Sequence, residues 1–445
     1  MIPWLALASF IWLFRYLRLI INCLSHWTYR STPPLEKSSY NAHDVTIIMP
    51  TISFDLEQIQ RTIRSCLAAA QCEIILVGVD ANVAFLTGIA QAIGPKVRVL
   101  CTHEANKRGQ ICHAIPQVQT PITIFVDDDV IWPNTIMPWL LAPFHDEQVG
   151  GVGTSQRLVR STRQSVWFFL GAAYLERRNF DCSACLHIDG GLPCLSGRTV
   201  AYRSEILQDP AFTYHFTHEE WRTCQLNTDD DNFLTRWLFN HDWKIAMQYH
   251  AEAEVQTTLA EGPLYLTQCL RWVRSNWRSN LTSLIVERRC WRTHPWTTYA
   301  VLQTTLTAWA LPYDLLIAWA WYRAMGAMSL YDAKIVLLVL WFAFSKTVKL
   351  WGHFYRYPSD IIFVPVYILF GYFHGVIKFY GLLTLSETKW GSRAEADTDD
   401  NVRMIRLPSY QEQDDSHNHR DFAMLEDEET KVSSEELPPY PTMSL

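Results

Sequence analysis

Apolar residues gather in four long runs near the two ends of the chain. A helix needs about 20 apolar residues to cross the roughly 30 Å hydrocarbon core of a bilayer. Each run is therefore long enough to span a membrane or to lie at its surface. The runs cover residues 2–24, 299–322, 334–351 and 361–385.

Charged and helix-breaking residues interrupt two of these runs. Arg15 and Arg18 lie in the first, and Pro312 and Asp314 lie in the second, which makes both doubtful spans. No basic segment precedes the first run and no small-residue cleavage site is obvious after it, so we interpret it as an anchor rather than a signal peptide. The pattern predicts an N-terminal membrane helix over 1–25 and further membrane helices within 296–386.

Between these regions, residues 40–290 alternate between buried-strand and helix patterns. The strand patterns are "DVTIIMPT", "CEIILVGVD", "KVRVLCT" and "ITIFVDDD", and helical spacing occurs at 56–70, 84–93 and 107–117. Alternation of this kind predicts an α/β fold with a mostly parallel sheet and flanking helices. A further helix over 159–179 has basic ends; it could lie on a membrane surface or cover the sheet.

Charge is unevenly distributed along the chain. The net charge is −7, but residues 394–445 alone carry 14 acidic and 4 basic side chains, which leaves about +3 for the rest. This acidic segment lacks periodicity and is predicted to be a disordered tail, with either a regulatory or a merely solvating role. Basic residues flank the later apolar runs and indicate cytosolic loops there: Arg288, Arg289, Arg292, Lys346 and Lys349.

The eleven cysteines show no spacing typical of a secreted disulfide scaffold, which favours reduced thiols. Cys182, Cys185, His187 and Cys194 could in principle bind zinc. No second tight ligand pair accompanies the first, so we favour packed free thiols.

Two groups of aspartates follow predicted strands. Asp80 ends the second strand pattern, and Asp127 and Asp129 end the fourth. Two carboxylates with one residue between them can hold a hard divalent cation and leave positions open for phosphate oxygens. An isolated pair of this kind is more often a solvated turn. Here the strand ends favour a ligand site, because ligands bind at the carboxyl ends of parallel strands.

The segment "NKRGQICHAI" places Lys107, Arg108 and Gly109 where a helix begins. A cation beside a glycine at a helix N-terminus suits a diphosphate, although an ordinary basic cap would look the same.

A third acidic group, Asp229, Asp230 and Asp231, precedes an amphipathic helix. N-capping accounts for part of it. Three acids exceed what a cap needs, and crowded carboxylates raise one another's pKa, which suits a general base for a hydroxyl.

The run "LTQCLRWVRSNWRSNL" combines guanidinium and indole groups. Gln268, Arg271 and Trp272 fall on one helical face. Arg271 could neutralise a departing diphosphate and Trp272 could stack on a sugar ring. Alone, the run would be better interpreted as a basic interfacial helix with Trp anchors. Its position after three acidic groups favours the catalytic interpretation.

Taken in this order, the motifs resemble those of the family 2 glycosyltransferases, specifically the processive membrane synthases of hyaluronan, chitin and cellulose. The family pattern of D, DxD, an acid pair and QxxRW is matched here by Asp80, Asp127/Asp129, Asp230/Asp231 and Gln268–Trp272. "CLSGRTVAYR", "DDNFLT" and "RWVRSNWRSNL" extend the likeness, which covers about 44–393. The tail resembles that of a fungal type 2 glycosyltransferase or capsule-type polysaccharide synthase. "VDAN" departs from the common DDGS, and Gln110 stands where Asn is frequent.

The resemblance implies a GT-A fold and an inverting transfer from a UDP-sugar to a growing polysaccharide. It assigns the nucleotide to Pro50, Thr51, Asp80, Lys107 and Asp127. It assigns Mg²⁺ or Mn²⁺ to Asp127 and Asp129, and the acceptor to Ser196, Gly197 and Trp272. It assigns catalysis to Asp230, Asp231, Gln268, Arg271 and Trp272, with Asp231 as the base.

Two alternatives stay open from the sequence. A lipid glycosyltransferase of the ceramide glucosyltransferase kind shares the motif order and adds a single sugar, and a non-enzymatic scaffold could retain the fold. The favoured interpretation is a multi-pass plasma-membrane synthase with a cytosolic catalytic domain. A lipid membrane is an expected partner and nucleic acid is not. The acidic tail is expected on the cytosolic side.

Overall fold

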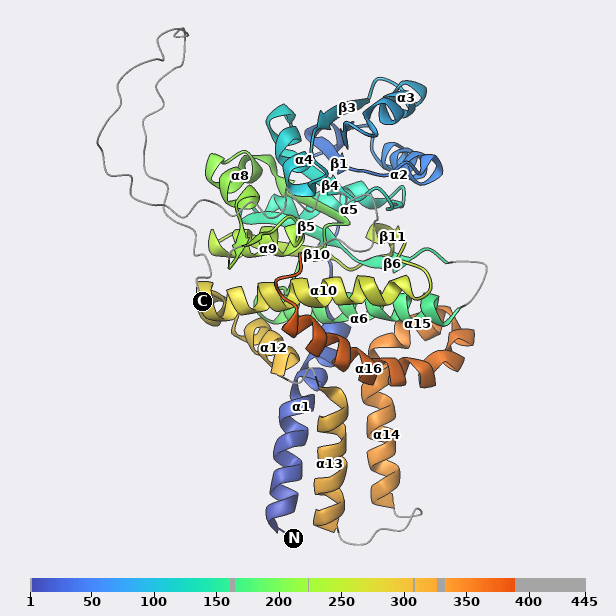
Figure 1. Ribbon diagram of the computed structural model, residues 1–445, viewed down its shortest axis with the longest axis vertical. Helices are drawn as coiled ribbons and strands as arrows, with labels where there is room; N and C mark the ends of the chain where they lie inside the picture. The colour runs from blue at the N-terminus through green and yellow to red at the C-terminus, as the bar shows by residue number, and fades with distance from the viewer. Residues whose placement is uncertain (1, 161–164, 223, 307–308, 326–332, 389–445) are drawn as a thin grey trace, which may run out of the picture.

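The computed structural model describes residues 2–160, 165–222, 224–306, 309–325 and 333–388 (Figure 1). The predicted acidic tail over 394–445 lies outside the described residues. The described chain folds into a sheet domain, a layer of long helices beneath it, and a bundle of helices that extends away from both.

The central sheet has seven strands in the order β10-β5-β7-β4-β1-β2-β3. All neighbours pair in parallel except β7, which runs antiparallel to both β4 and β5. This confirms the predicted mostly parallel α/β sheet. Its strands are β1 (Val45–Pro50), β2 (Glu73–Val79), β3 (Val97–Thr102), β4 (Ile122–Val126), β5 (Val149–Thr154), β7 (Thr199–Arg203) and β10 (Lys244–Gln248).

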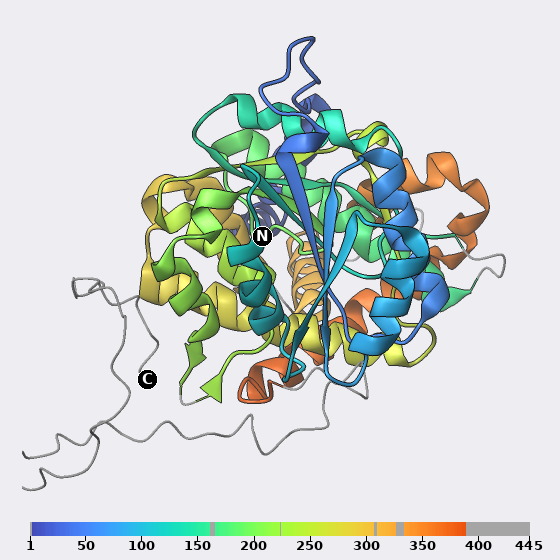
Figure 2. The ribbon, with the colours of Figure 1, turned by 90° about the horizontal axis from the view of Figure 1, so that it is seen from above.

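Helices cover both faces of the sheet because its central strands are apolar on both sides. In β1, Ile47 packs with one hydrophobic cluster and Ile48 with the other. The first cluster includes α2 (Leu56–Ala69), α3 (Val83–Ile93) and α5 (Ile136–Leu141), and the second includes α4 (Lys107–Ala114), α8 (Pro210–Thr217) and α9 (Asp230–Asn240). Seen from above, α2 and α3 lie on one side of the strands and α8 and α9 on the other (Figure 2).

Short strands and helices complete the domain. Two-stranded sheets pair β6 with β11 in parallel and β8 with β9 antiparallel. Their bounds are β6 (Gln156–Leu158), β11 (Val255–Thr257), β8 (Glu220–Trp221) and β9 (Cys224–Gln225); the short helices are α7 (Ser204–Leu207) and α11 (Cys290–Thr293).

Beneath the sheet, α6 (Val166–Asp189) and α10 (Leu264–Leu281) lie side by side (Figure 1). Phe169, Leu170 and Ala173 of α6 share a hydrophobic cluster with residues of α10. The helix expected at 159–179 begins later, because the Ser165 hydroxyl caps the backbone N–H of Phe168. It covers the sheet domain and also packs on helices of the apolar runs. Its position at a membrane surface stays a prediction.

The apolar runs form α1 (Ile2–Thr28), α12 (Pro295–Leu306), α13 (Ala310–Met325), α14 (Ala333–Thr347), α15 (Trp351–Arg356) and α16 (Val364–Leu383). Within the described residues, three helical segments are long and apolar enough to cross a membrane, namely Pro3–Thr28, Ile335–Arg356 and Pro358–Leu383. Helices α1, α13 and α14 extend together away from the sheet, whereas α16 lies along α10 (Figure 1).

The charges that interrupt the apolar runs are paired. Asp314 in α13 is buried and forms ion pairs with Arg15 at 2.8 Å and with Lys346 at 2.6 Å. Asp181 in α6 lies 2.6 Å from Lys349 and 3.9 Å from Arg18. Pairing lowers the cost of placing these charges among apolar helices. Arg15 and Asp314, which made the first two apolar runs doubtful spans, thus join those two runs to each other. Arg18 joins the first run to α6.

The packing of α16 on α10 depends on a glycine. A Cβ at Gly381 would lie 2.5 Å from Val273 Cγ1, and the β-branched valine cannot rotate away freely. We expect Gly381→Ala to destabilise the protein by about 1–3 kcal/mol through overpacking, measured by thermal unfolding in detergent. Gly371→Ala in the same helix is the control, since a Cβ at Gly371 would have no described atom within 4 Å. Equal unfolding temperatures for the two variants would contradict this account.

Candidate active site

Twelve of the thirteen predicted site residues line one cavity of about 360 Å³ between the carboxyl ends of the sheet strands and α10. They are Pro50, Thr51, Lys107, Asp127, Asp129, Ser196, Gly197, Asp230, Asp231, Gln268, Arg271 and Trp272. Residues from positions 50 to 272 of the chain therefore meet at one place. Pro50 and Asp127 lie at the carboxyl ends of strands, where ligands of parallel sheets bind. Gln268, Arg271 and Trp272 come from α10, beneath the sheet.

Asp80 is the exception and does not line this cavity. Its side chain is 61% exposed just beyond β2, where a carboxylate oxygen lies 2.7 Å from His103 Nδ1. The Cys101 thiol donates to the other oxygen at 3.2 Å. These two hydrogen bonds, from His103 first and Cys101 second, lower the pKa of Asp80.

Lys107 joins two of the acidic groups. It is the first residue of α4, and its ammonium lies 2.8 Å from Asp127 and 2.9 Å from Asp230. Burial alone would lower the pKa of Lys107, but the two carboxylates outweigh burial and raise it. The lysine is therefore a fixed positive charge between the loop after β4 and the start of α9. Gly197 lies against this bridge, because a Cβ there would be 3.4 Å from Lys107 Nζ.

The three aspartates after β4 have different surroundings. Asp128 is buried and accepts a hydrogen bond of 2.5 Å from the Thr51 hydroxyl, which fixes the loop that follows β1. All three aspartates line the cavity. Asp129 accepts from the Thr258 hydroxyl at 2.8 Å, and burial, followed by the charges of Asp127 and Asp128, raises its pKa.

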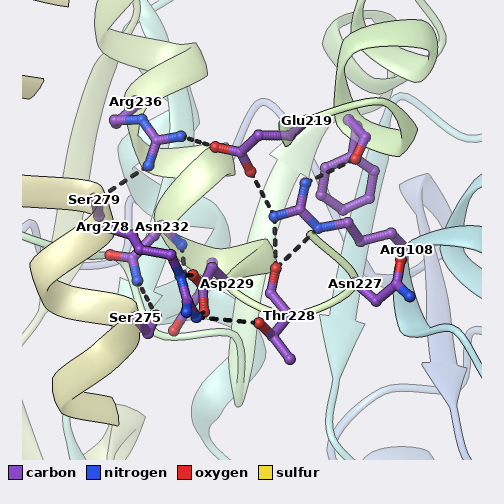
Figure 3. Close-up of polar contacts among 12 residues, drawn as sticks. Arg108, Glu219, Asn227, Thr228, Asp229, Asn232, Arg236, Ser275, Arg278 and Ser279 are labelled. Carbon is purple, nitrogen blue, oxygen red and sulfur yellow. Dashed lines mark hydrogen bonds and ion pairs between the residues drawn. The ribbon is translucent and has the colours of Figure 1, made fainter. Parts of the chain in front are cut away.

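Asp229 anchors the third acidic group to α10 (Figure 3). It caps α9 with φ at +66°, a left-handed conformation that is uncommon outside glycine. Its carboxylate forms a two-point ion pair with Arg278, at 2.7 and 3.1 Å. Burial alone would raise the pKa of Asp229, but Arg278 outweighs it and the pKa is lowered. This charged anchor sets the direction of the next two aspartates.

A second arginine supports the same loop from the other side (Figure 3). Arg108 is 1% exposed and donates to the carbonyl oxygen of Thr228 at 3.1 and 2.6 Å and to that of Phe216 at 2.8 Å. It also forms an ion pair of 2.6 Å with Glu219, which in turn binds Arg236. Of the two basic residues in "NKRG", Lys107 thus lines the cavity. Arg108 instead binds the backbone carbonyl oxygen of Thr228, the residue before Asp229.

Asp231 has the surroundings of a general base. Burial and then the neighbouring Asp230 carboxylate raise its pKa, an effect that Arg178 and Lys107 oppose only in part. The backbone N–H of Asn232 donates to one carboxylate oxygen at 2.9 Å. A raised pKa makes a carboxylate a better proton acceptor, so Asp231 is suited to deprotonate a hydroxyl in the cavity.

The residues of α10 form the floor of the cavity. Gln268 accepts the backbone N–H of Ala260 at 3.1 Å, which holds the preceding loop. Burial lowers the pKa of Arg271, an effect that Asp229 and its two neighbours oppose. Trp272 stacks on Tyr174 of α6, with ring centroids 4.5 Å apart and planes 10° apart.

Several cavity residues were not predicted from the sequence, among them Tyr174, Arg178 and Arg198. Tyr174 and Arg178 lie one turn apart on α6, whose pattern was interpreted as a surface or covering helix. Arg198 follows the predicted acceptor residues Ser196 and Gly197, and its guanidinium lies 5.9 Å from the centre of the Trp272 ring. The basic residues of α6 and the arginine after "CLSG" are the sequence features from which these cavity residues could have been predicted.

The four residues considered for zinc do not converge. Within the described residues, no group of three or more His, Cys, Asp or Glu side chains is placed to hold a metal ion. Cys182 and Cys185 are buried free thiols on α6, and His187 Nδ1 faces the Ser25 carbonyl oxygen at 3.0 Å.

Comparison with known proteins agrees with this geometry. Residues 43–275 match the family described as "Glycosyltransferase like family 2". A "Type 2 glycosyltransferase" of Zymoseptoria tritici is 60% identical over 413 residues, covering 92% of this chain and 87% of that protein. A hyaluronan synthase of Streptococcus pyogenes is 23% identical over 79% of this chain and 84% of its own.

Among solved structures, a mannosyltransferase of Pyrobaculum calidifontis in complex with GDP-Man and Mn²⁺ has a TM-score of 0.48 and 15% identity. The match covers 82% of this chain and 98% of that one. The chain belongs to the family 2 glycosyltransferases, enzymes that depend on a nucleotide sugar.

The Asp229 anchor gives a stability prediction. Asp229→Asn retains the shape and the tolerance of left-handed backbone but leaves the buried Arg278 without its carboxylate, so we expect a loss of about 3 kcal/mol in thermal unfolding. Asp242→Asn is the matched control, because Asp242 also has a positive φ, of 62°, but its side chain is 76% exposed. We expect less than about 1 kcal/mol there. Similar losses for both variants would show that backbone conformation, not the ion pair, is what matters.

Proposed function

We propose that this protein is an inverting, metal-dependent transferase that moves a sugar from a UDP-sugar to a growing polysaccharide at the membrane. One observation carries the proposal. A single cavity joins a carboxylate pair that suits a divalent cation, two cations that suit a diphosphate, and a buried carboxylate with a raised pKa.

The carboxylate pair fits Mg²⁺ or Mn²⁺. Both ions prefer oxygen ligands, and a site with one or two protein carboxylates leaves positions for phosphate oxygens and water. Asp127 and Asp129 would hold the ion. The pKa of Asp129 is raised first by burial and then by the negative charges of Asp127 and Asp128, and a cation would relieve that crowding of charge. When bound, the ion supplies positive charge against the diphosphate.

The remaining residues divide the reaction between them. Asp231 removes the proton from the acceptor hydroxyl, and the hydroxyl oxygen forms a bond to the anomeric carbon of the donor. The bond from that carbon to the diphosphate breaks with inversion, and UDP leaves with the bonding electrons. Lys107 and Arg271 neutralise the charge that develops on the diphosphate, which is the larger part of catalysis in such transfers. Pro50 and Thr51 contact the nucleotide; Asp80 keeps that role only if its exposed loop closes over the uridine.

The acceptor is proposed to reach Asp231 from the membrane side. A second cavity, of about 440 Å³, shares Tyr174, Trp272 and Asn276 with the first. The stacked pair of Trp272 and Tyr174 offers flat aromatic faces at this border, where Ser196 and Gly197 also line the first cavity. This arrangement supports a polymer that moves away from the site after each transfer. A lipid acceptor that receives one sugar is the second candidate, because apolar helices also line the second cavity.

We infer a membrane arrangement from the same geometry. Helices α1, α13 and α14 would cross the bilayer, and α6, α10 and α16 would lie along its surface. The described chain ends on the catalytic side, since Arg278 donates to the carbonyl oxygens of Leu385 and Glu387. The acidic tail would then share the cytosol with the catalytic domain, at the plasma membrane.

The first test is UDP release by the full-length protein in detergent across a panel of UDP-sugars with Mn²⁺ or Mg²⁺. We expect one donor to give turnover and a long product, and Asp231→Asn to reduce kcat at least about a hundredfold. Asp242→Asn is the control carboxylate outside the cavity. Turnover only with added lipid, giving a one-sugar product, would favour the lipid transferase. A fully active Asp231→Asn variant would overturn the assignment of the base.

The pH profile tests the surroundings of the base. Transfer needs the deprotonated form of Asp231, so kcat should fall as the pH drops through a pKa above the value of about 3.9 for an ordinary aspartate. Asp230 contributes to the raised pKa. Asp230→Asn should therefore move the acidic limb to lower pH, whatever its effect on the maximal rate. An acidic limb that stays in place or moves upward would contradict this role for Asp230.

A further inference from the structure

The second cavity has an unusual lining for a space among apolar helices. Its lining residues come from α1, α6, α10, α12, α13, α14 and α16, helices that lie below the sheet in Figure 1. Six basic side chains line it, namely Arg15, Arg18, Arg177, Lys346, Lys349 and Lys378. In the part of the chain that the structure describes, Asp181 is the one acidic side chain of this lining.

Two carboxylates compensate four of these cations. Asp181 contacts Lys349 and, at 3.9 Å, Arg18. Asp314, just outside the lining, contacts Arg15 and Lys346. The positive charge of this part of the cavity therefore exceeds the negative charge even where ion pairs form.

The other two cations have no carboxylate in direct contact, although Arg177 interacts with the Tyr367 hydroxyl and with the charge of Asp181. Among the described residues, no carboxylate lies within 4.0 Å of Arg177 or of Lys378, although both side chains face the cavity. They come from different helices, α6 and α16. Placing cations together among apolar helices is costly unless an anion or water accompanies them, and such residues usually mark a binding site.

Helix α6 connects this charge to the reaction. Its successive residues Arg177 and Arg178 diverge, so that Arg178 lines the active site and Arg177 lines the second cavity. Tyr174, one turn earlier, lines both. A molecule that passes the Trp272–Tyr174 pair would therefore enter the cavity that Arg177 and Lys378 line.

We propose that the second cavity binds an anionic group, a carboxylate or a phosphate, that the acceptor carries behind its reacting hydroxyl. The proposal rests on the proposed transfer and narrows its acceptor to an acidic molecule. A uronic acid in a growing polysaccharide and the phosphate of a lipid headgroup present the same chemistry to Arg177 and Lys378. A neutral glycan or a neutral lipid would leave both cations without an anionic partner.

The test uses the full-length protein in detergent and two pairs of probes that differ only in charge. The first pair is a hexasaccharide of alternating glucuronic acid and N-acetylglucosamine and its carboxyl-reduced form. The second is oleoyl lysophosphatidic acid and monooleoylglycerol. Binding is measured as a dissociation constant at fixed salt. We expect the anionic member of at least one pair to bind about tenfold more tightly than its neutral partner, which corresponds to about 1.4 kcal/mol. The pair that shows the preference identifies the source of the anion.

Variants localise the effect to this cavity. Lys378→Gln and Arg177→Gln should each remove most of the preference, Lys378→Arg should retain it, and the salt dependence of binding should weaken with the lost charge. Lys37→Gln is the control, since Lys37 is exposed on a loop outside both cavities. Thermal unfolding of each variant shows that it is folded.

Two results would overturn the proposal. The first is equal affinity of the charged and neutral members in both pairs. The second is a preference that persists in the Arg177→Gln, Lys378→Gln double variant. UDP release, measured on the same protein, distinguishes a failure of the anionic-acceptor proposal from a failure of the proposed sugar transfer. Release without any charge preference counts against the acidic acceptor alone, and charge preference without release counts against the transfer alone.

Discussion

The active site depends on the separation of negative charges by fixed cations. Six aspartates from the loop after β4 and the start of α9 surround one cavity, and without positive charge between them they could not all stay ionised at neutral pH. Lys107 lies between Asp127 and Asp230, and Arg278 holds Asp229. Within the described residues, Asp129 and Asp231 have no direct lysine or arginine contact, and they are the two whose pKa is raised. Those two are also the ones proposed to work on a cation and on a proton.

The same constraint shapes the membrane side of the molecule. Arg15 and Asp314 would each be costly in an apolar helix, and each is placed so that the other compensates it. These pairs tie α1, α13 and α14 to one another, and the pair of Asp181 and Lys349 ties this bundle to α6. Among the described residues, Arg177 and Lys378 have no carboxylate in direct contact, and both line the second cavity. Pairing therefore distinguishes charges that hold helices together from charges available to a ligand.

Much of the site could be predicted from the sequence because strand ends and helix periodicity are local properties. Asp127, Asp129 and the Gln268–Trp272 face followed from them, and the mostly parallel sheet did too. Tertiary contacts decided the rest. Lys107 and Arg108 are adjacent and chemically alike, and only the position of α9 makes one a cavity residue and the other a buried support. Asp80 satisfies the strand-end rule but turns toward His103. No local pattern marks the positive φ of Asp229 or its ion pair with Arg278, which lies 49 residues further along the chain.

The amino-acid composition of α10 reflects its three different surroundings, which are the active-site cavity, the helices α6 and α16, and the start of α9. Gln268, Arg271, Trp272 and Ser275 recur at helical spacing and line the active site. Tyr265, Cys269 and Val273 recur on another face and pack among α6 and α16. Arg278 and Ser279 face the start of α9 and its Arg236. A helix that must present polar groups to a cavity, apolar groups to neighbouring helices and a guanidinium to a buried aspartate cannot carry a single apolar stripe. Its mixture of arginine, tryptophan and small polar residues is what contact with all three surroundings requires, and residues of α10 line both cavities.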